Sequence, residues 1–238
     1  SVTETPTLLI DMDPQANATS GLGVEIDSNS KTIYDAIIDE AKVEDCIHKT
    51  NLKYLDVIPS TYSLVGAEIE LVPQMKREDR LKNVISQVSG KYKYIIIDSA
   101  PSLGLLTLNV LSASNAVIIP VQCEYYALEG LSQLLNTIRL VQKHLNKDLY
   151  IEGILITMYD NRLNLSKQVL KEVSEYFDDK VYKTLIKRNV RLGEAPSHGK
   201  PVLLYDVGCA GSQAYIHLAS EVLKREKIVS GVKNGKRN

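Results

Sequence analysis

Two aspartates one residue apart, Asp11 and Asp13, end the apolar run Thr7–Ile10 near the start of the chain. Carboxylates at the carboxyl end of a buried strand lie where open α/β sheets bind their ligands. Pro14 stops the strand, and the polar loop of residues 17–21 that follows suits phosphate, metal or water. The pattern indicates a phosphate- or metal-binding loop. The alternative is that the two aspartates only end a strand and cap a helix.

A second apolar run, Tyr94–Asp98, reads YIIID and also closes on an aspartate. Its nearly continuous apolar character is typical of a strand buried on both faces in a parallel sheet. An apolar run followed by Asp is common in α/β proteins and carries little information alone. Its pairing with the DMDPQ segment at residues 11–15 makes it specific.

The elements that position these residues follow from the apolar runs. Five strands separated by helical segments imply right-handed crossovers and a mainly parallel sheet covered on both sides, so the predicted fold class is α/β, doubly wound. The predicted strands are Thr7–Ile10, Leu55–Ile58, Tyr94–Ile97, Ala116–Val121 and Ile151–Thr157. Further predictions are a helix over Ser166–Phe177 with Ser166 as its N-cap, a last short strand over Pro201–Tyr205 and a closing helix over Gln213–Lys227.

The segment DMDPQANATSGLG, residues 11–23, resembles the ParA/Soj family of deviant-Walker ATPases that segregate chromosomes and plasmids. The segments over Gln122–Thr137 and Asn189–Pro201 are also similar to that family, and the resemblance covers about residues 7–227. Ala16 is a departure, because the family usually has Gly there. The resemblance implies a P-loop NTPase fold, divided here into 1–6 (non-family residues), 7–227 (ATPase domain) and 228–238 (flexible basic tail).

The resemblance also implies roles for three carboxylates. In the family, an aspartate at the position of Asp13 orients the water that attacks the γ-phosphate, and one at the position of Asp11 supports the magnesium site. Asp98 would hold magnesium through water. The implied cofactors are therefore ATP and Mg.

A local basic patch lies between Lys180 and Arg191. The resemblance implies that Arg162 and Arg191 line a nonspecific DNA-binding face of the ATP-bound dimer, and guanidinium groups suit phosphate contacts that read no bases. The alternative is an ordinary solvated basic surface. By the same resemblance, Met158 and Asn189 contact the nucleotide base.

No G-x-x-x-x-G-K-[ST] phosphate loop occurs in the 238 residues. The Gly-Lys pairs begin at Gly90, Gly199 and Gly235, and none is followed by Ser or Thr. We expect the first strand and phosphate loop of the family to be missing from this chain, which leaves an open sheet edge between the strand ending at Asp98 and the one starting at Ala116. The family hydrolyses ATP, but the chain as given is predicted to be inactive.

Composition restricts the partners. A net charge of -1 argues against an overall affinity for DNA or membranes, so DNA contact would need a local patch. Three widely spaced cysteines without a CxxC pair predict a reduced protein without structural metal. No stretch approaches 18 apolar residues, which predicts a protein that does not span a membrane.

The function implied by the resemblance is an ATP-switched homodimer that binds DNA nonspecifically and acts with a ParB/Spo0J-like partner, in the cytoplasm and associated with the nucleoid. Two alternatives stay open. One is a pseudo-ATPase fragment that acts only by binding DNA or partners. The other is a MinD-like membrane regulator, against which the tail has few large apolar residues.

Overall fold

The computed structural model describes residues 4–102 and 104–235, without the side chains of residues 227–235. The chain forms two compact units. Unit 1 comprises Ser1–Ala116, Gln133–Tyr150 and Ala195–Pro201, and unit 2 comprises Val117–Ser132, Ile151–Glu194 and Val202–Asn238.

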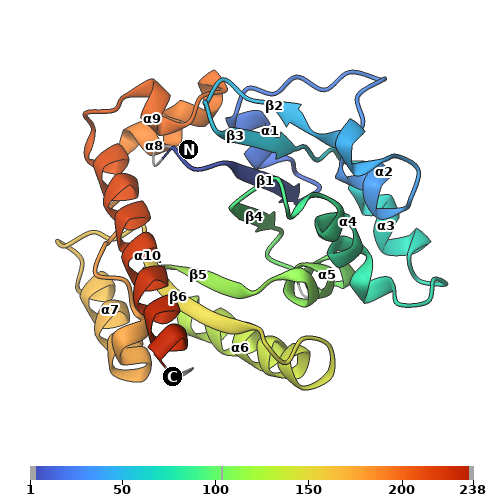
Figure 1. The fold of residues 1–238 in the computed structure, drawn as a ribbon. Coiled ribbons are helices and arrows are strands. Elements are labelled where there is room, and N and C mark those ends of the chain that lie inside the picture. The colour runs from blue at the N-terminus through green and yellow to red at the C-terminus, as the bar shows by residue number, and fades with distance from the viewer. Residues whose placement is uncertain (1–3, 103, 236–238) are drawn as a thin grey trace. The chain divides into compact units, whose positions relative to one another are not determined.

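The centre of unit 1 is a four-stranded sheet in the order β2-β3-β1-β4 (Figure 1). Its strands are β1 (Thr7–Met12), β2 (His48–Lys49), β3 (Leu55–Ile58) and β4 (Tyr94–Ser99). β1 pairs in parallel with both β3 and β4, in a register that places Asp11 beside Asp98, and the short β2 runs antiparallel to β3. The mixed, mainly parallel sheet confirms the predicted α/β class, and both aspartate-bearing strands end at the same sheet edge.

The core of unit 1 forms around β1, whose Leu8, Ile10 and Met12 are fully buried. Helix α4 contributes Leu81, Val84 and Val88, spaced at three and four residues so that one face of the helix reaches this core. The helices of this unit are α1 (Asn17–Gly21), α2 (Ile33–Ile37), α3 (Leu64–Glu70), α4 (Arg80–Val88) and α5 (Leu105–Ala113), with short 3-10 turns η1 (Val43–Cys46), η2 (Arg77–Asp79) and η4 (Ala195–His198).

The predicted open sheet edge is present at β4. Among the described strands, β4 pairs with β1 alone. Its Ile96 is 56% exposed, although the strand has the apolar composition of one buried on both faces. The free backbone edge and the exposed apolar side chain have the same cause, which is that no described strand pairs with the second edge of β4. A strand of this composition is covered on both sides when it lies inside a parallel sheet.

Unit 2 contains a two-stranded sheet, β5 (Ala116–Gln122) with β6 (Tyr150–Thr157). A small core of Leu155, Tyr182 and Ile186 packs against the closing helix α10. The guanidinium of Arg225 on that helix lies 4.2 Å from the centre of the Tyr182 ring. The remaining elements are α6 (Ala127–His144), which begins in unit 2 and continues into unit 1, and α7 (Asn164–Phe177), η3 (Asp178–Lys180), α8 (Val190–Glu194), α9 (Val202–Tyr205) and α10 (Ala210–Gly235).

Two local predictions were wrong. Residues 202–205 form helix α9 rather than a strand, and the hydroxyl of Ser212 donates to the carbonyl oxygens of Val202 and Asp206. Helix α7 begins at Asn164, so Ser166 lies inside its first turn and its hydroxyl accepts from the backbone N–H of Asp160. In both places a serine hydroxyl forms hydrogen bonds with the backbone and stabilises the local structure. The spacing of apolar residues cannot predict such hydrogen bonds.

The C-terminal boundary also differs from the expected one. Helix α10 continues to Gly235, whereas the sequence predicted a flexible tail from residue 228. The last part of that predicted tail, residues 236–238, lies outside the described residues.

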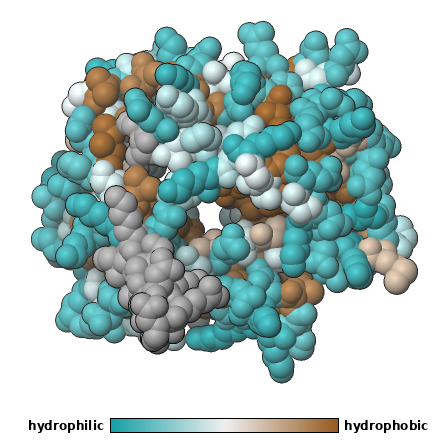
Figure 2. Space-filling view, in the orientation of Figure 1, coloured by the Kyte–Doolittle hydropathy of each residue, from teal (hydrophilic) through white to brown (hydrophobic). Residues whose placement is uncertain are grey.

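Figure 2 shows hydrophilic side chains over most of the visible face, with separate areas of hydrophobic ones. Within residues 4–102 and 104–235, no helix combines the length and apolar character needed to cross a membrane.

Candidate functional site

Asp11 anchors the loop that follows β1. Its side chain is fully buried, and Oδ2 accepts hydrogen bonds from the Thr19 backbone N–H at 2.9 Å and the Thr19 hydroxyl at 2.7 Å. Oδ1 accepts from the backbone N–H of Asp13 at 3.1 Å. The Thr19 oxygen in turn accepts from the backbone N–H of Ser60 at 3.0 Å. Asp11 therefore joins β1, helix α1 and the segment after β3 through one buried network.

Asp13 is held more loosely. Its side chain is half-buried, and Oδ1 accepts from the backbone N–H of Gln15 at 2.9 Å. This hydrogen bond two residues along is an Asx-turn, which fixes the local backbone. A carboxylate oriented by its own loop and only partly buried can contact a bound water or ligand.

Asp98 lies beside Asp11 in the register of β4 and β1. Partial removal from water raises its pKa above the usual value, and the negative charges of Asp11 and Asp13 raise the pKa further. The three carboxylates predicted to act together are therefore close enough to repel one another.

This carboxyl edge offers oxygen atoms of the kind that a hard divalent cation prefers. Oxygen ligands are the ones magnesium prefers, and a cation would relieve the repulsion that raises the pKa of Asp98. Because the Asp11 oxygens already accept three hydrogen bonds inside the loop, Asp98 and Asp13 are the available ligands, direct or through water. In the described part of the chain, no group of three or more His, Cys, Asp or Glu residues forms a metal cluster.

Ala16 occupies a strained position at the start of α1. Its φ is 54°, in the left-handed region where glycine is favoured. The departure from the Gly that the resemblance implies thus falls at a residue whose conformation favours glycine. The loop keeps this geometry because Asp11 and Thr19 hold both of its ends.

Two glycines bring η4 against the end of the same loop. Gly23 and Gly199 both have positive φ, 67° and 59°. A Cβ on Gly23 would lie 2.5 Å from the carbonyl oxygen of Gly199, and one on Gly199 would lie 3.1 Å from the Gly23 Cα. Residues at the end of the NVRLGEAPSHGKP segment therefore contact the loop directly, within unit 1.

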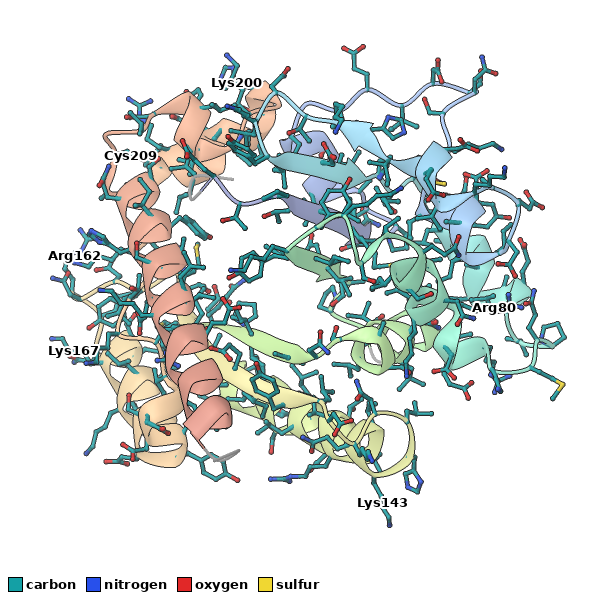
Figure 3. The ribbon with its side chains drawn as sticks, in the orientation of Figure 1. Arg80, Lys143, Arg162, Lys167, Lys200 and Cys209 are labelled. Atoms are coloured by element: carbon teal, nitrogen blue, oxygen red, sulfur yellow. The ribbon has the colours of Figure 1, made fainter. Side chains whose placement is uncertain are left out.

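Arg162 lies on the surface of unit 2, between β6 and α7 (Figure 3). Its Nε and Nη2 donate to the two oxygens of Asp160 at 2.9 and 2.6 Å, and its backbone N–H also donates to Asp160. These hydrogen bonds and the charge of Arg162 hold the pKa of Asp160 well below its usual range. The Arg162 side chain is 84% exposed, so the pair presents a guanidinium to solvent.

Arg191 is also exposed and paired. Its Nη1 donates to Glu194 at 2.8 Å, its Nε lies 3.4 Å from Asp206, and its guanidinium lies near the Tyr205 ring. The structure places both predicted arginines in unit 2, on exposed side chains fixed by carboxylates.

The two residues predicted to contact a base lie on adjoining segments of unit 2. Met158 has a φ of 54° and is 37% exposed directly after β6. Tyr159 bridges to Lys187, two residues before Asn189. The Asn189 side chain accepts from the backbone N–H of Arg191 at 2.9 Å, so it also helps to fix Arg191.

Sequence reasoning missed Ser60 and Gly199 at this site. Thr19 lies in the polar loop predicted from the sequence, but its hydrogen bond with Ser60 joins residues 41 apart and was not predicted. The signal for Gly199 was weak, since it lies in a segment selected only for its resemblance to the family.

Comparison with known proteins identifies the relatives of this fold. The family described as "AAA domain" matches residues 3–151. The Sporulation initiation inhibitor protein Soj of Bacillus subtilis is 63% identical over 215 residues, covering 90% of this chain and 85% of Soj. The Chromosome partitioning protein ParA of Myxococcus xanthus is 52% identical over 223 residues, covering 94% and 79% of the two chains.

A solved structure agrees with the fold. The crystal structure of cobyrinic acid a,c-diamide synthase from Mycobacterium smegmatis, with bound ATP analog and magnesium, has a TM-score of 0.81 and 32% identity. The match covers 95% of this chain and 86% of that one. With the carboxyl edge of the sheet and these matches together, the chain belongs to the ParA/Soj family of chromosome-partitioning ATPases.

Proposed function

We propose that this chain provides the switch and surface regions of a partition protein that binds ATP and Mg, dimerises in the ATP state and binds DNA nonspecifically. It acts with a ParB-like partner at the nucleoid, in chromosome or plasmid segregation. The observation that carries the proposal is the placement of Asp11, Asp13 and Asp98 at one sheet edge in a chain 63% identical to Soj. ATP analog and magnesium are bound by a solved structure of the same fold.

Each carboxylate has a distinct part in this proposal. Asp13, half-buried and fixed by its Asx-turn, orients the attacking water and accepts hydrogen bonds from it. Asp98 would hold the cation, through water, when one is bound. Asp11 takes no direct part; it is a positioning residue that fixes the distance between Asp13 and α1.

The cofactors supply the remaining chemistry. When bound, magnesium neutralises charge on the phosphates, and a phosphate loop contributes backbone amides and lysine. Without those cations, two ionised carboxylates facing a triphosphate repel it. The chain as given should therefore bind ATP poorly and should not hydrolyse it.

The deciding experiment compares the chain as given with one extended by a family-type KGGxGKTT segment ahead of Thr7. Calorimetry measures nucleotide binding, and phosphate release measures turnover. We expect turnover in the extended protein only. Asp13→Ala should abolish turnover with nucleotide binding retained, because the phosphate cradle is unchanged. Magnesium-dependent turnover by the unextended chain, lost on Asp13→Ala, would overturn the requirement for a phosphate loop.

A second candidate function is favoured by the exposed guanidinium of Arg162, which Asp160 holds in place. In that case the chain acts by binding DNA or a partner without hydrolysis. DNA binding by the chain as given, independent of ATP and unchanged in Asp13→Ala, would support this candidate over the switch.

A further inference from the structure

A hollow of about 570 Å³ opens in unit 1 at the amino ends of β1, β3 and β4. The carboxylates of the candidate site lie at the opposite, carboxyl ends of the same parallel strands. Three chain segments line the hollow: Pro6 before β1, residues 49–56 around the turn into β3, and Lys91 with Tyr92 before β4.

The lining is basic in a chain whose net charge is -1. Lys49, Lys53 and Lys91 line it, against one carboxylate, Asp56. Asp56 is 8% exposed and already satisfied, since it accepts from Lys49 at 2.8 Å and from the Tyr92 hydroxyl at 2.7 Å. The hollow therefore has a buried, neutralised floor and an excess of ammonium groups at its rim.

Two of these lysines are available to a ligand. The ammonium of Lys53 lies 4.8 Å from the centre of the Tyr54 ring, and no carboxylate of the described residues pairs with it. Lys91 pairs with Glu44 at 3.2 Å, but both side chains are about half exposed. Exposed pairs of this kind contribute at most about 1 kcal/mol, so a multiply charged anion can compete with Glu44.

Tyr92 fixes the floor of the hollow. Its pKa is raised by burial and by its hydrogen bond to Asp56, so the hydroxyl stays protonated and keeps donating to that carboxylate. Asp56 consequently does not point a free negative charge at a ligand. Lysine binds phosphate as a point charge, whereas arginine binds it through two parallel hydrogen bonds. Lysines at the rim can therefore bind a phosphate without a fixed bidentate geometry.

We propose that this hollow binds a phosphate-bearing anion through Lys53 and Lys91, with Lys49 as a third cation at the rim. The phosphate is either free or part of a nucleic-acid backbone, and in both cases it presents negatively charged oxygens to the lysines. The site is separate from the carboxyl edge and does not depend on the proposed ATP switch.

The test uses the chain as given and an NMR titration of its backbone amides. The probes are inorganic pyrophosphate in one arm and a short DNA duplex in the other, at constant ionic strength. We expect saturable shifts of residues 49–56 and 91–92. A Lys53→Ala/Lys91→Ala variant should weaken binding at least about tenfold, because two charge contacts are removed. Lys53→Arg/Lys91→Arg retains both charges and should retain binding.

Lys143→Ala is the matched control, since Lys143 is in the same unit and its side chain points outward from α6 (Figure 3). Both tested lysines are exposed, so circular dichroism should show an unchanged fold. Shifts in the pyrophosphate arm support a free anion as the ligand, and shifts in the DNA arm alone support a nucleic-acid phosphate. The proposal fails if neither probe shifts these amides, or if the alanine pair binds as tightly as Lys143→Ala.

Discussion

The carboxylates of unit 1 and the arginines of unit 2 are held in opposite ways. Asp11 is fully buried and accepts two hydrogen bonds from Thr19, whose hydroxyl in turn accepts from Ser60, 41 residues further along the chain. Arg162 and Arg191 are exposed and pair with carboxylates two, three and fifteen residues away. Buried hydrogen bonds are costly to break, whereas exposed ion pairs contribute little and rearrange easily. The difference indicates a rigid loop after β1 and an adaptable basic surface.

The largest expected effect tests the rigid half of this comparison. Asp11→Ala leaves the backbone N–H and hydroxyl of Thr19 without their buried acceptor. We expect the free energy of unfolding to fall by about 3 kcal/mol, because buried donors lose their partner and a cavity forms. Urea denaturation of the chain measures the change.

Asp13→Ala is the control for that measurement. Its carboxylate makes one hydrogen bond, at a half-buried position. The expected loss of stability is within about 1 kcal/mol. Equal losses for the two variants would show that Asp11 has no special structural part.

The sequence predicted this carboxyl edge well, because an apolar run closed by Asp reports a strand end directly. It could not predict that Ser60 donates to the Thr19 hydroxyl, since that hydrogen bond joins residues 41 apart in the sequence. The sequence prediction was wrong at α9, where a short apolar segment fits either a strand or a helix. There the hydroxyl of Ser212 donates to the carbonyl oxygens of Val202 and Asp206 and stabilises the helix. The open edge at β4 was predictable because it depends on which strands are present in the chain.

The second prediction concerns the close approach of the two glycines. Gly23→Ala places a Cβ 2.5 Å from a backbone oxygen at a φ of 67°. The expected loss of stability is about 2 kcal/mol, since neither strain nor clash can be relieved by a side-chain rotation. Thermal unfolding measures it. Gly90→Ala, whose Cβ would meet nothing within 4 Å, is the control. Equal melting temperatures for the two variants would show that the contact between η4 and the loop is not tight.

The third prediction tests the adaptable half. Arg162→Glu and Arg191→Glu should each weaken nonspecific DNA binding by the dimer and lower the slope of log affinity against log salt by about 1, because each phosphate contact releases counterions. Fluorescence anisotropy with a labelled duplex at several salt concentrations measures both. Lys143→Glu is the control for the change in net charge.

Asp160→Asn refines the third prediction. It removes the carboxylate that competes with phosphate for Arg162, so DNA affinity should rise. If the affinity falls instead, Asp160 acts by orienting Arg162 rather than by competing for it.

Unchanged DNA affinity in both Arg162→Glu and Arg191→Glu would show that the two arginines form an ordinary solvated surface.

The smallest expected effect is a pH dependence at the carboxyl edge. Removal from water and the charges of Asp11 and Asp13 raise the pKa of Asp98. The folded chain therefore keeps this proton to a higher pH than the unfolded chain does, and the associated stability, full at acidic pH, is lost as the pH rises through the folded-state pKa. Asp98→Asn replaces the ionisable carboxyl by a neutral amide, so the variant does not lose this stability as the pH rises. The variant should therefore be more stable than the parent at neutral pH, by an amount that shrinks on acidification.

Urea denaturation in a metal chelator, at several values between about pH 4 and pH 8, measures this difference across the range where a carboxyl of raised pKa titrates. Asp27→Asn gives a control of opposite sign, because the hydroxyl of Ser30 lowers the pKa of Asp27 and its stabilisation is present above the unfolded-state value. Added magnesium should then stabilise the parent more than Asp98→Asn, since the cation relieves the repulsion only where the third carboxylate remains. If Asp98→Asn is less stable than the parent at neutral pH in the chelator, Asp98 is not repelled by Asp11 and Asp13. Relief of repulsion would then no longer explain why a cation binds at the carboxyl edge.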